Sequence, residues 1–151
     1  MTSYELAQVN VAWLKYPLEA PEMKDFTDNL DSVNADAEAA DGFVWRLLPG
    51  DGEDHADLRF FGEERLLPNM SVWRDSNALT AFMYQGTHRG LLARRFEFFE
   101  RPREAMTALW WVPSGHRPTI AEAEKKLTRL RELGPTPEAF TLGRSFPPPG
   151  A

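Results

Sequence analysis

The stretch from residue 66 to residue 99 constrains the fold more than any other, because a strand pattern leads directly into a helical one. Residues 67–73 (LPNMSVW) have the pattern of a β-strand, and Asp75 or Ser76 then offers a side-chain oxygen to cap a helix. Gly86 divides the helical region into pieces at 77–84 and 88–100. We expect this unit to organise the rest of the chain.

The spacing of apolar residues predicts the other elements. Residues 4–14 alternate between polar and apolar side chains over part of their length, as a half-buried strand does. Met23, Phe26 and Leu30 recur at three- and four-residue steps, which places one apolar stripe on a helix. Together with the strand of the central unit, the expected strands are 4–14, 43–48, 66–73 and 105–112, with a short optional strand at 57–62. The other expected helices are 21–40 and 119–134.

This order of elements predicts an α+β fold. A βαββαβ succession is that of the ferredoxin-like fold, here an antiparallel sheet with helices on one face. The 151 residues suit a single domain, 1–151, with 119–134 as an appended helix and 143–151 as a flexible tail. Aromatic side chains fall on both faces of such a sheet, so we expect a second copy to cover the open face as a homodimer. These aromatics are Trp13, Trp45, Trp73, Trp110 and Trp111.

Composition and charge exclude several functions. No cysteine is present, which excludes disulfides, thiolate catalysis and cysteine-ligated metals. The net charge of −6 argues against nucleic acid as a partner, because phosphate binding needs a concentrated basic face. No apolar run reaches about 18 residues, as a membrane-spanning helix requires, and the N-terminus lacks a secretory pattern. We therefore expect a cytoplasmic protein that binds neither nucleic acid nor membrane.

Several segments resemble an uncharacterised bacterial family, domain of unknown function family 3291, within the dimeric α/β barrel superfamily. They are residues 5–10, 42–47, 69–73, 109–119 and 134–141, of which WWVPSGHRP is the most specific part. The resemblance implies two ferredoxin-like sheets that face each other in a homodimer. The superfamily includes antibiotic-biosynthesis monooxygenases and several heme enzymes, and some members use a pocket between the sheet and its helices.

In the heme-degrading monooxygenases of that superfamily, three side chains line the pocket: an Asn of the first strand, an aromatic of the second helix and a helix His. By position Asn10 matches the Asn, and His88 lies near the His. Phe82 falls where the pattern has Trp. The resemblance therefore implies Asn10 and His88 as the candidate catalytic residues.

The residues themselves give His88 and Asn10 alternative roles. On a helix that starts near residue 88, Leu92, Arg95 and Phe99 lie on nearly the same side as the histidine, so its imidazole should point at apolar surface. There it could ligate heme iron or act as a base toward a phenolic substrate, or it could bond to backbone or water. Asn10 lies in mid-strand, where an amide must be paired or face a pocket.

Further side chains are candidates for substrate binding. Asn69 and Ser71 share one face of their strand, where they are either solvated or line a pocket. His116 and Arg117 follow the last strand, where they could bind a carboxylate or phosphate or fix the loop in place. The full set of expected binding residues is Asn69, Ser71, Trp73, Phe82, Leu92, His116 and Arg117.

Three functions remain open. No sequence motif for a phosphate cradle, a metalloprotease or a nucleophilic serine is present, and we expect no metal site. The first function is a cofactor-independent monooxygenase-like enzyme for a hydrophobic aromatic compound, with His88 and Asn10 as catalytic residues. The second is a heme-binding protein with His88 as axial ligand. The third is a non-catalytic dimer that binds a small hydrophobic ligand or is purely structural.

Overall fold

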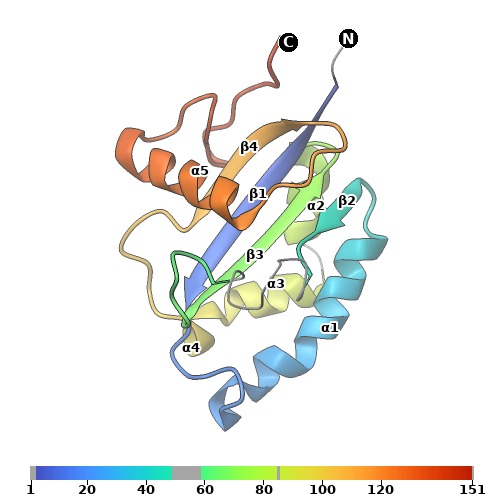
Figure 1. Cartoon of the computed structure of the whole chain (residues 1–151). Coiled ribbons are helices and arrows are strands. Elements are labelled where there is room, and N and C mark those ends of the chain that lie inside the picture. The colour runs from blue at the N-terminus through green and yellow to red at the C-terminus, as the bar shows by residue number, and fades with distance from the viewer. Residues whose placement is uncertain (1–2, 49–58, 85, 151) are drawn as a thin grey trace.

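The structure is a computed structural model that describes residues 3–48, 59–84 and 86–150, and the side chains of residues 86–88 lie outside this description. It is an α+β fold with a four-stranded antiparallel sheet in the order β2-β3-β1-β4 (Figure 1). The elements are β1 (Tyr4–Trp13), the 3-10 helix η1 (Pro21–Met23), α1 (Lys24–Ala39), β2 (Phe43–Arg46), β3 (Leu66–Trp73), α2 (Ser76–Met83), α3 (Gly86–Ala93), α4 (Arg95–Phe98), β4 (Thr107–Pro113) and α5 (Ile120–Leu133).

The predicted elements are largely confirmed, with two differences. The helix expected at 88–100 is two helices, α3 and α4, because the backbone leaves helical geometry at Arg94. The optional strand at 57–62 is wrong over the residues described there. Phe60 and Glu63 form an isolated bridge around a tight turn in which Phe61 has a φ of 54°. Residues 49–54, whose Gly, Pro and Asp content predicts an exposed loop, lie outside the described residues.

Successive residues of β1 point to opposite faces of the sheet, and each face has its own core. On one face, which we call the α5 face, Ala7, Val9 and Val11 pack in one cluster with Leu127 and Leu130 of α5. Figure 1 views the sheet from this side, with α5 in front and α2 and α3 behind. The prediction of helices on one face only is therefore wrong, since the appended helix covers part of the other.

The opposite face, which we call the α1–α2 face, carries two separate apolar clusters. In the first, Leu6 and Trp73 pack with Ala37 of α1 and Phe82 of α2. The second lies where β1 ends and joins side chains from η1, α1 and α4: Leu14, Met23, Phe26 and Phe98. Between the two clusters the same face carries polar side chains, which makes it unlike the continuous core under α5.

Hydrogen bonds fix the start of α2 and attach the C-terminal segment to the edge strand β4. The Asp75 side chain accepts a hydrogen bond from the Ala78 N–H at 2.9 Å and so caps α2. At the edge of the sheet, Phe140 exchanges two backbone hydrogen bonds with Leu109 of β4, each 2.9 Å long. The Trp111 indole donates to the Phe146 carbonyl at 2.8 Å, so part of the expected tail packs on β4. Among the described residues, no helix is long and apolar enough to cross a membrane.

Candidate binding site on the sheet

A group of polar side chains crosses the middle of the α1–α2 face. The strand register sets Gln8 of β1 opposite Ser71 of β3, and it sets Asn10 opposite Asn69. On the other side of β1, Asn10 is opposite Thr107 of β4. Opposite residues in an antiparallel pair point to the same face, so all five side chains share it. We call Gln8, Asn10, Asn69, Ser71 and Thr107 the polar row.

Hydrogen bonds connect the polar row and tie it to the apolar cluster beside it. The Gln8 side-chain N–H groups donate to Asn69 Oδ1 at 3.0 Å and to Ser71 Oγ at 2.7 Å. Ser71 Oγ also accepts from the Trp73 indole N–H at 2.8 Å. Thr107 donates its hydroxyl hydrogen to Asn10 Oδ1 at 3.1 Å. These bonds fix the rotamers of the row.

Exposure changes sharply along the row. Gln8 and Ser71 are 7% and 6% exposed, and they are the buried polar residues of the described chain. Asn10 and Asn69, two residues further along their strands, are exposed. Both lie on the inner strands β1 and β3, each of which has a strand on either side. The helix layer therefore leaves the middle of this face accessible, with a buried polar network at one end of the opening.

The five side chains of the row are neutral, so they can form hydrogen bonds but cannot act as acid or base. Asn10 and Asn69 use their side-chain oxygens as acceptors within the row, which leaves the N–H groups of both amides for a ligand. Ser71 accepts two bonds and keeps its own hydroxyl hydrogen to donate. None of the row's atoms is a carboxylate, an imidazole or a thiolate. The row can orient the carbonyl or hydroxyl oxygen of a bound molecule.

Aromatic surface borders the row at its buried end. The rings of Trp73 and Phe82 are stacked, with centroids 5.2 Å apart and an interplanar angle of 25°. The Phe43 ring lies nearly perpendicular to that of Trp73, with centroids 5.6 Å apart. At the opposite end, the second cluster places partly buried Leu67 and Leu91 against buried Phe98. A molecule on the row would meet amides in the middle and apolar side chains at both ends.

The structure brings most of the sequence-predicted residues together. Asn10, Asn69 and Ser71 belong to the row, and Trp73 and Phe82 belong to the cluster beside it. Leu92 lies on α3 and is half-buried. His88 lies in the first turn of α3, and its side chain is outside the described part of the chain.

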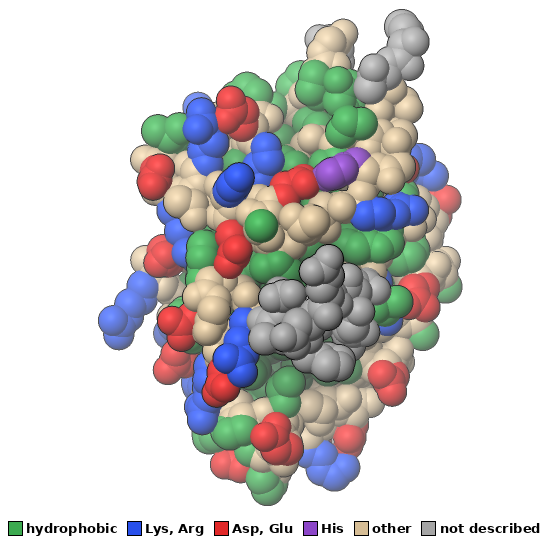
Figure 2. Space-filling model, viewed as in Figure 1, with side chains coloured by type: hydrophobic (Ala, Val, Ile, Leu, Met, Phe, Trp, Pro, Cys, Tyr) green, Lys and Arg blue, Asp and Glu red, His purple; other side chains and the backbone are tan. Residues whose placement is uncertain are grey.

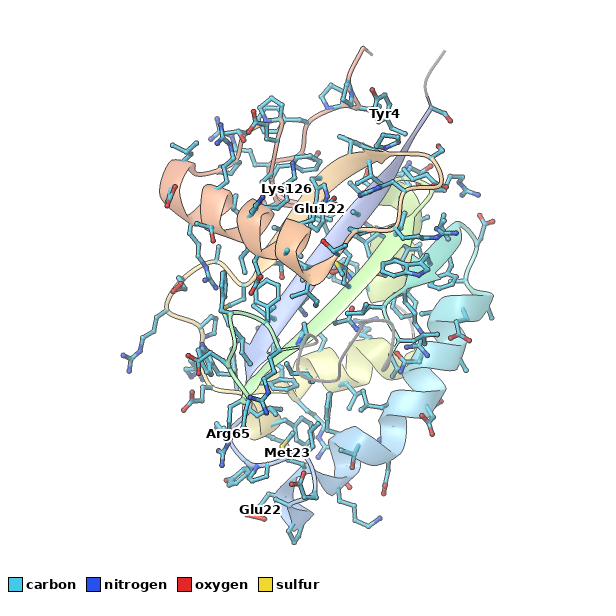
Figure 3. The ribbon with its side chains drawn as sticks, in the orientation of Figure 1. Tyr4, Glu22, Met23, Arg65, Glu122 and Lys126 are labelled. Atoms are coloured by element: carbon cyan, nitrogen blue, oxygen red, sulfur yellow. The ribbon has the colours of Figure 1, made fainter. Side chains whose placement is uncertain are left out.

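His116 and Arg117 lie apart from the row, at the start of α5. His116 Nε2 lies 2.6 Å from one oxygen of Glu122, and the Trp110 indole donates to the other at 2.8 Å. Thr119 caps the helix by accepting from the Glu122 N–H at 3.1 Å. These contacts fix the loop to α5, which Figure 3 shows with Glu122 labelled. Within the described residues, no side chain bonds to Arg117.

Sequence analysis missed Gln8 and Thr107. Gln8 makes two of the four side-chain hydrogen bonds of the row and is nearly fully buried. Its signal is visible in hindsight: it lies two residues before Asn10, so both share a strand face. Thr107 carries no such signal, because only the β1–β4 register shows that it is opposite Asn10.

The polar row contains no side chain of the kinds that usually bind a metal ion or heme iron. Within the described residues, no three His, Cys, Asp or Glu side chains are grouped to hold a metal ion. Heme iron in proteins is held by His, Cys, Met or Tyr. The row offers amides and hydroxyls instead. The donor set of the row therefore does not fit heme ligation.

Comparison with known proteins gives a family and distant structural similarity. Residues 5–151 match the family described as Domain of unknown function (DUF3291). Two solved structures are similar at 14% identity and a TM-score of 0.48. The NE2512 protein of unknown function from Nitrosomonas europaea covers 76% of this chain and 93% of its own. PA3566 from Pseudomonas aeruginosa covers 77% of this chain and 99% of its own. No curated protein matches the sequence.

Proposed function

Because this chain belongs to the DUF3291 family, whose description names no function, we propose a function from its own geometry. We propose that the protein binds a small aromatic molecule that carries a hydroxyl or carbonyl group, and that this ligand lies on the polar row. The observation that carries this proposal is the exposed pair Asn10 and Asn69 on the two inner strands, backed by the buried Gln8, Ser71 and Trp73 network.

The cost of burying polar groups supports this assignment. An amide or hydroxyl that loses water without a partner costs about 1–3 kcal/mol in proteins. Gln8 and Ser71 avoid this cost by bonding to each other at 2.7 Å. Exposed Asn10 and Asn69, by contrast, keep the two apolar clusters of this face apart. Ligand sites combine apolar walls with a few oriented polar groups. The row between Phe82 and Phe98 has that composition.

The test uses 2-naphthol, a flat aromatic with one hydroxyl, and naphthalene, which lacks it. Saturable shifts of the Trp73 indole N–H resonance on adding 2-naphthol are expected, because that group is bonded to Ser71. Asn10→Leu removes one exposed amide, and one net hydrogen bond is worth about 1 kcal/mol, so binding of 2-naphthol should weaken by about fivefold to tenfold.

The matched control is Asn77→Leu, which removes an exposed amide on α2 that makes no hydrogen bond to another described residue. This variant should bind 2-naphthol as the parent does. Naphthalene should bind Asn10→Leu and the parent equally, since it has no group for the amide. Equal affinity of 2-naphthol for the parent and Asn10→Leu would remove the polar row as its site.

A monooxygenase-like reaction at the row is the second candidate. It is favoured by the position of α3, which carries His88 and packs against α1 and α2. The imidazole would serve as base toward a phenolic substrate, with Asn10 as its positioning partner. Oxygen uptake with 1,4-dihydroxynaphthalene, above the rate of its spontaneous oxidation, tests this. His88→Ala should abolish the difference, and equal uptake by both proteins would exclude His88 as the base.

We also propose a ferredoxin-like arrangement and a homodimer for this chain. The succession β1, α1, β2, β3, α2, β4 supports the first. For the second, α5 packs on β4 and β1, whereas Val44, Trp45 and Leu47 beside β3 are only partly buried on the α5 face. A second copy could cover them by a two-fold contact. Sedimentation at micromolar concentration should give twice the monomer mass of 17.2 kDa.

A further inference from the structure

Three cationic side chains contact Phe96 at the end of the sheet where β1 stops, and a fourth, Arg65, bonds to the backbone of one of them. The guanidinium carbons of Arg95 and Arg101 lie 4.5 and 4.3 Å from the centre of the Phe96 ring. Lys15 donates from Nζ to the Phe96 carbonyl at 2.6 Å. Arg65 donates to the Lys15 carbonyl at 3.3 Å. Figure 3 labels Arg65 at this end of the sheet, next to α4.

These four cations lack acidic partners within the described part of the chain. None of them forms an ion pair there, whereas eight other basic side chains do. The neighbouring Arg94 shows the contrast, because it bonds to Asp25 at 3.0 Å and to both oxygens of Glu97 at 2.8 Å. Elsewhere acids are plentiful, since the chain has 23 acidic residues against 17 Lys and Arg. Figure 2 shows both signs interspersed on the face it views.

An open pocket of about 540 Å³ adjoins this cluster. Its lining includes Trp13, Arg101, Arg103 and Met106, so Arg101 belongs both to the pocket and to the cluster. The backbone joins the two, since Lys15 donates to the Phe98 carbonyl at 2.9 Å and Glu100 to the Trp13 carbonyl at 2.8 Å.

Acidic groups in the pocket lining leave the positive charge in excess. Glu104 is neutralised by Arg131 at 3.0 Å. Glu100 is the lining carboxylate without an ion pair among the described residues. Arg101 and Arg103 outnumber it, with Lys15 and Arg95 next to them.

We propose that this pocket binds a small aromatic oxyanion, a phosphate or carboxylate joined to a flat ring. The ring would lie against Trp13 and Met106. The oxyanion would meet the Arg101 guanidinium, whose central carbon lies 4.3 Å from the centre of the Phe96 ring and which forms no ion pair among the described residues. This site is separate from the polar row, because Trp13 points to the α5 face whereas Asn10 points to the other.

The test is NMR titration of the full chain with phenyl phosphate, benzoate and the neutral analogue benzyl alcohol. The Trp13 indole resonance is identified by its loss in Trp13→Phe. Both anions should shift it saturably, and benzyl alcohol should not. Arg101→Gln should weaken binding of both anions by about tenfold, the loss of one charge-assisted contact. Arg129→Gln, which removes a cation of α5 paired with Glu138, should leave the affinity unchanged.

Folding of Arg101→Gln is checked by an unchanged Trp73 indole resonance, and Arg95→Gln serves as a second variant on the same ring. An unmoved Trp13 resonance at millimolar phenyl phosphate would overturn the proposal. So would equal affinities for the parent, Arg101→Gln and Arg95→Gln, or binding of benzyl alcohol as tight as that of benzoate. Phenyl phosphate tighter than benzoate would assign the site to phosphate esters, and the reverse order to carboxylates.

Discussion

The two faces of the sheet are built from the same strands and are filled differently. On the α5 face, Val9 of β1, Met70 of β3 and Ala108 of β4 form one apolar layer under the helix. On the α1–α2 face, the residues next in sequence place an amide, Asn10, between two apolar clusters. The residues that interrupt a core in this way lower the apolar area that the fold can bury. A continuous face stabilises the fold, and the interrupted face is therefore where a ligand is expected.

The largest expected change in unfolding free energy comes from substituting an apolar residue of β1 by a polar one, compared with the reverse substitution at the next residue. Val9 is fully buried on the α5 face, so Val9→Asn places an unpaired amide in an apolar layer and should cost about 3 kcal/mol of unfolding free energy. Asn10→Val, one residue further and on the other face, should change it by no more than about 0.5 kcal/mol. Urea unfolding of both variants measures the difference. Similar losses in the two would mean that the faces do not differ in this way.

Removing the shared acceptor of the polar row should have the next largest effect. Ser71 Oγ accepts from Gln8 and Trp73, so Ser71→Ala leaves a buried indole N–H without its partner. The unfolding free energy should fall by about 1–3 kcal/mol. Ser32→Ala, on the exposed side of α1, is the control and should stay within about 0.5 kcal/mol of the parent. An unchanged unfolding free energy in Ser71→Ala would show that these hydrogen bonds do not stabilise the fold.

Removing a polar contact at the margin of the α5 face should lower the unfolding free energy by less, and it should not change ligand binding. Glu122→Ala removes the acceptor of Trp110 and the partner of His116. The loss should be about 1 kcal/mol, because His116 is exposed and Glu122 itself is only partly buried, so that water can replace the acceptor that the buried Trp110 indole loses. Binding of 2-naphthol should be unaffected, since the polar row lies on the other face. A weakened affinity in this variant would contradict the separation of the two faces.

The sequence predicted the elements well where periodicity is a local property. Met23, Phe26 and Leu30 mark one side of the first helical region, and Thr119 marks the start of α5. The face that α5 covers could not be predicted, because an amphipathic helix shows that it packs and not where it packs. The break between α3 and α4 at Arg94 was also missed, since nothing in the composition there forbids a helix.

The candidate site was predicted in part, for a reason that lies in strand pairing. Asn10, Asn69 and Ser71 were chosen one strand at a time, as polar residues within apolar patterns. Their meeting depends on the register between β1 and β3, which a single sequence does not contain. The cation cluster at Phe96 depends on longer-range contacts still, because Lys15 follows β1 whereas Phe96 comes 81 residues later in the chain. Both sites are products of the tertiary fold.

The smallest expected change in stability concerns the ion pairs of Arg94, which attach α4 to α1, and this change depends on pH. On the α1–α2 side, Arg94 joins α4 to α1 through Asp25 and also bonds to Glu97, all at the exposed surface. Those hydrogen bonds from Arg94 hold the pKa of Glu97 below its ordinary range. A carboxyl with a lower pKa in the folded protein stabilises it above the unfolded pKa, and this contribution is lost as pH falls through the folded value.

Glu97→Gln should therefore lose less stability than the parent does between pH 6 and pH 3, measured as the shift of the urea midpoint. The effect is small because the pair is exposed and salt screens it, so the difference should shrink further at high ionic strength. Glu132→Gln, which removes an exposed acid of α5 with no ion pair among the described residues, should follow the parent. If acid lowers the urea midpoint of Glu97→Gln as steeply as that of the parent, the Arg94 contacts do not stabilise this side. Apolar packing alone would then attach the helices on both faces.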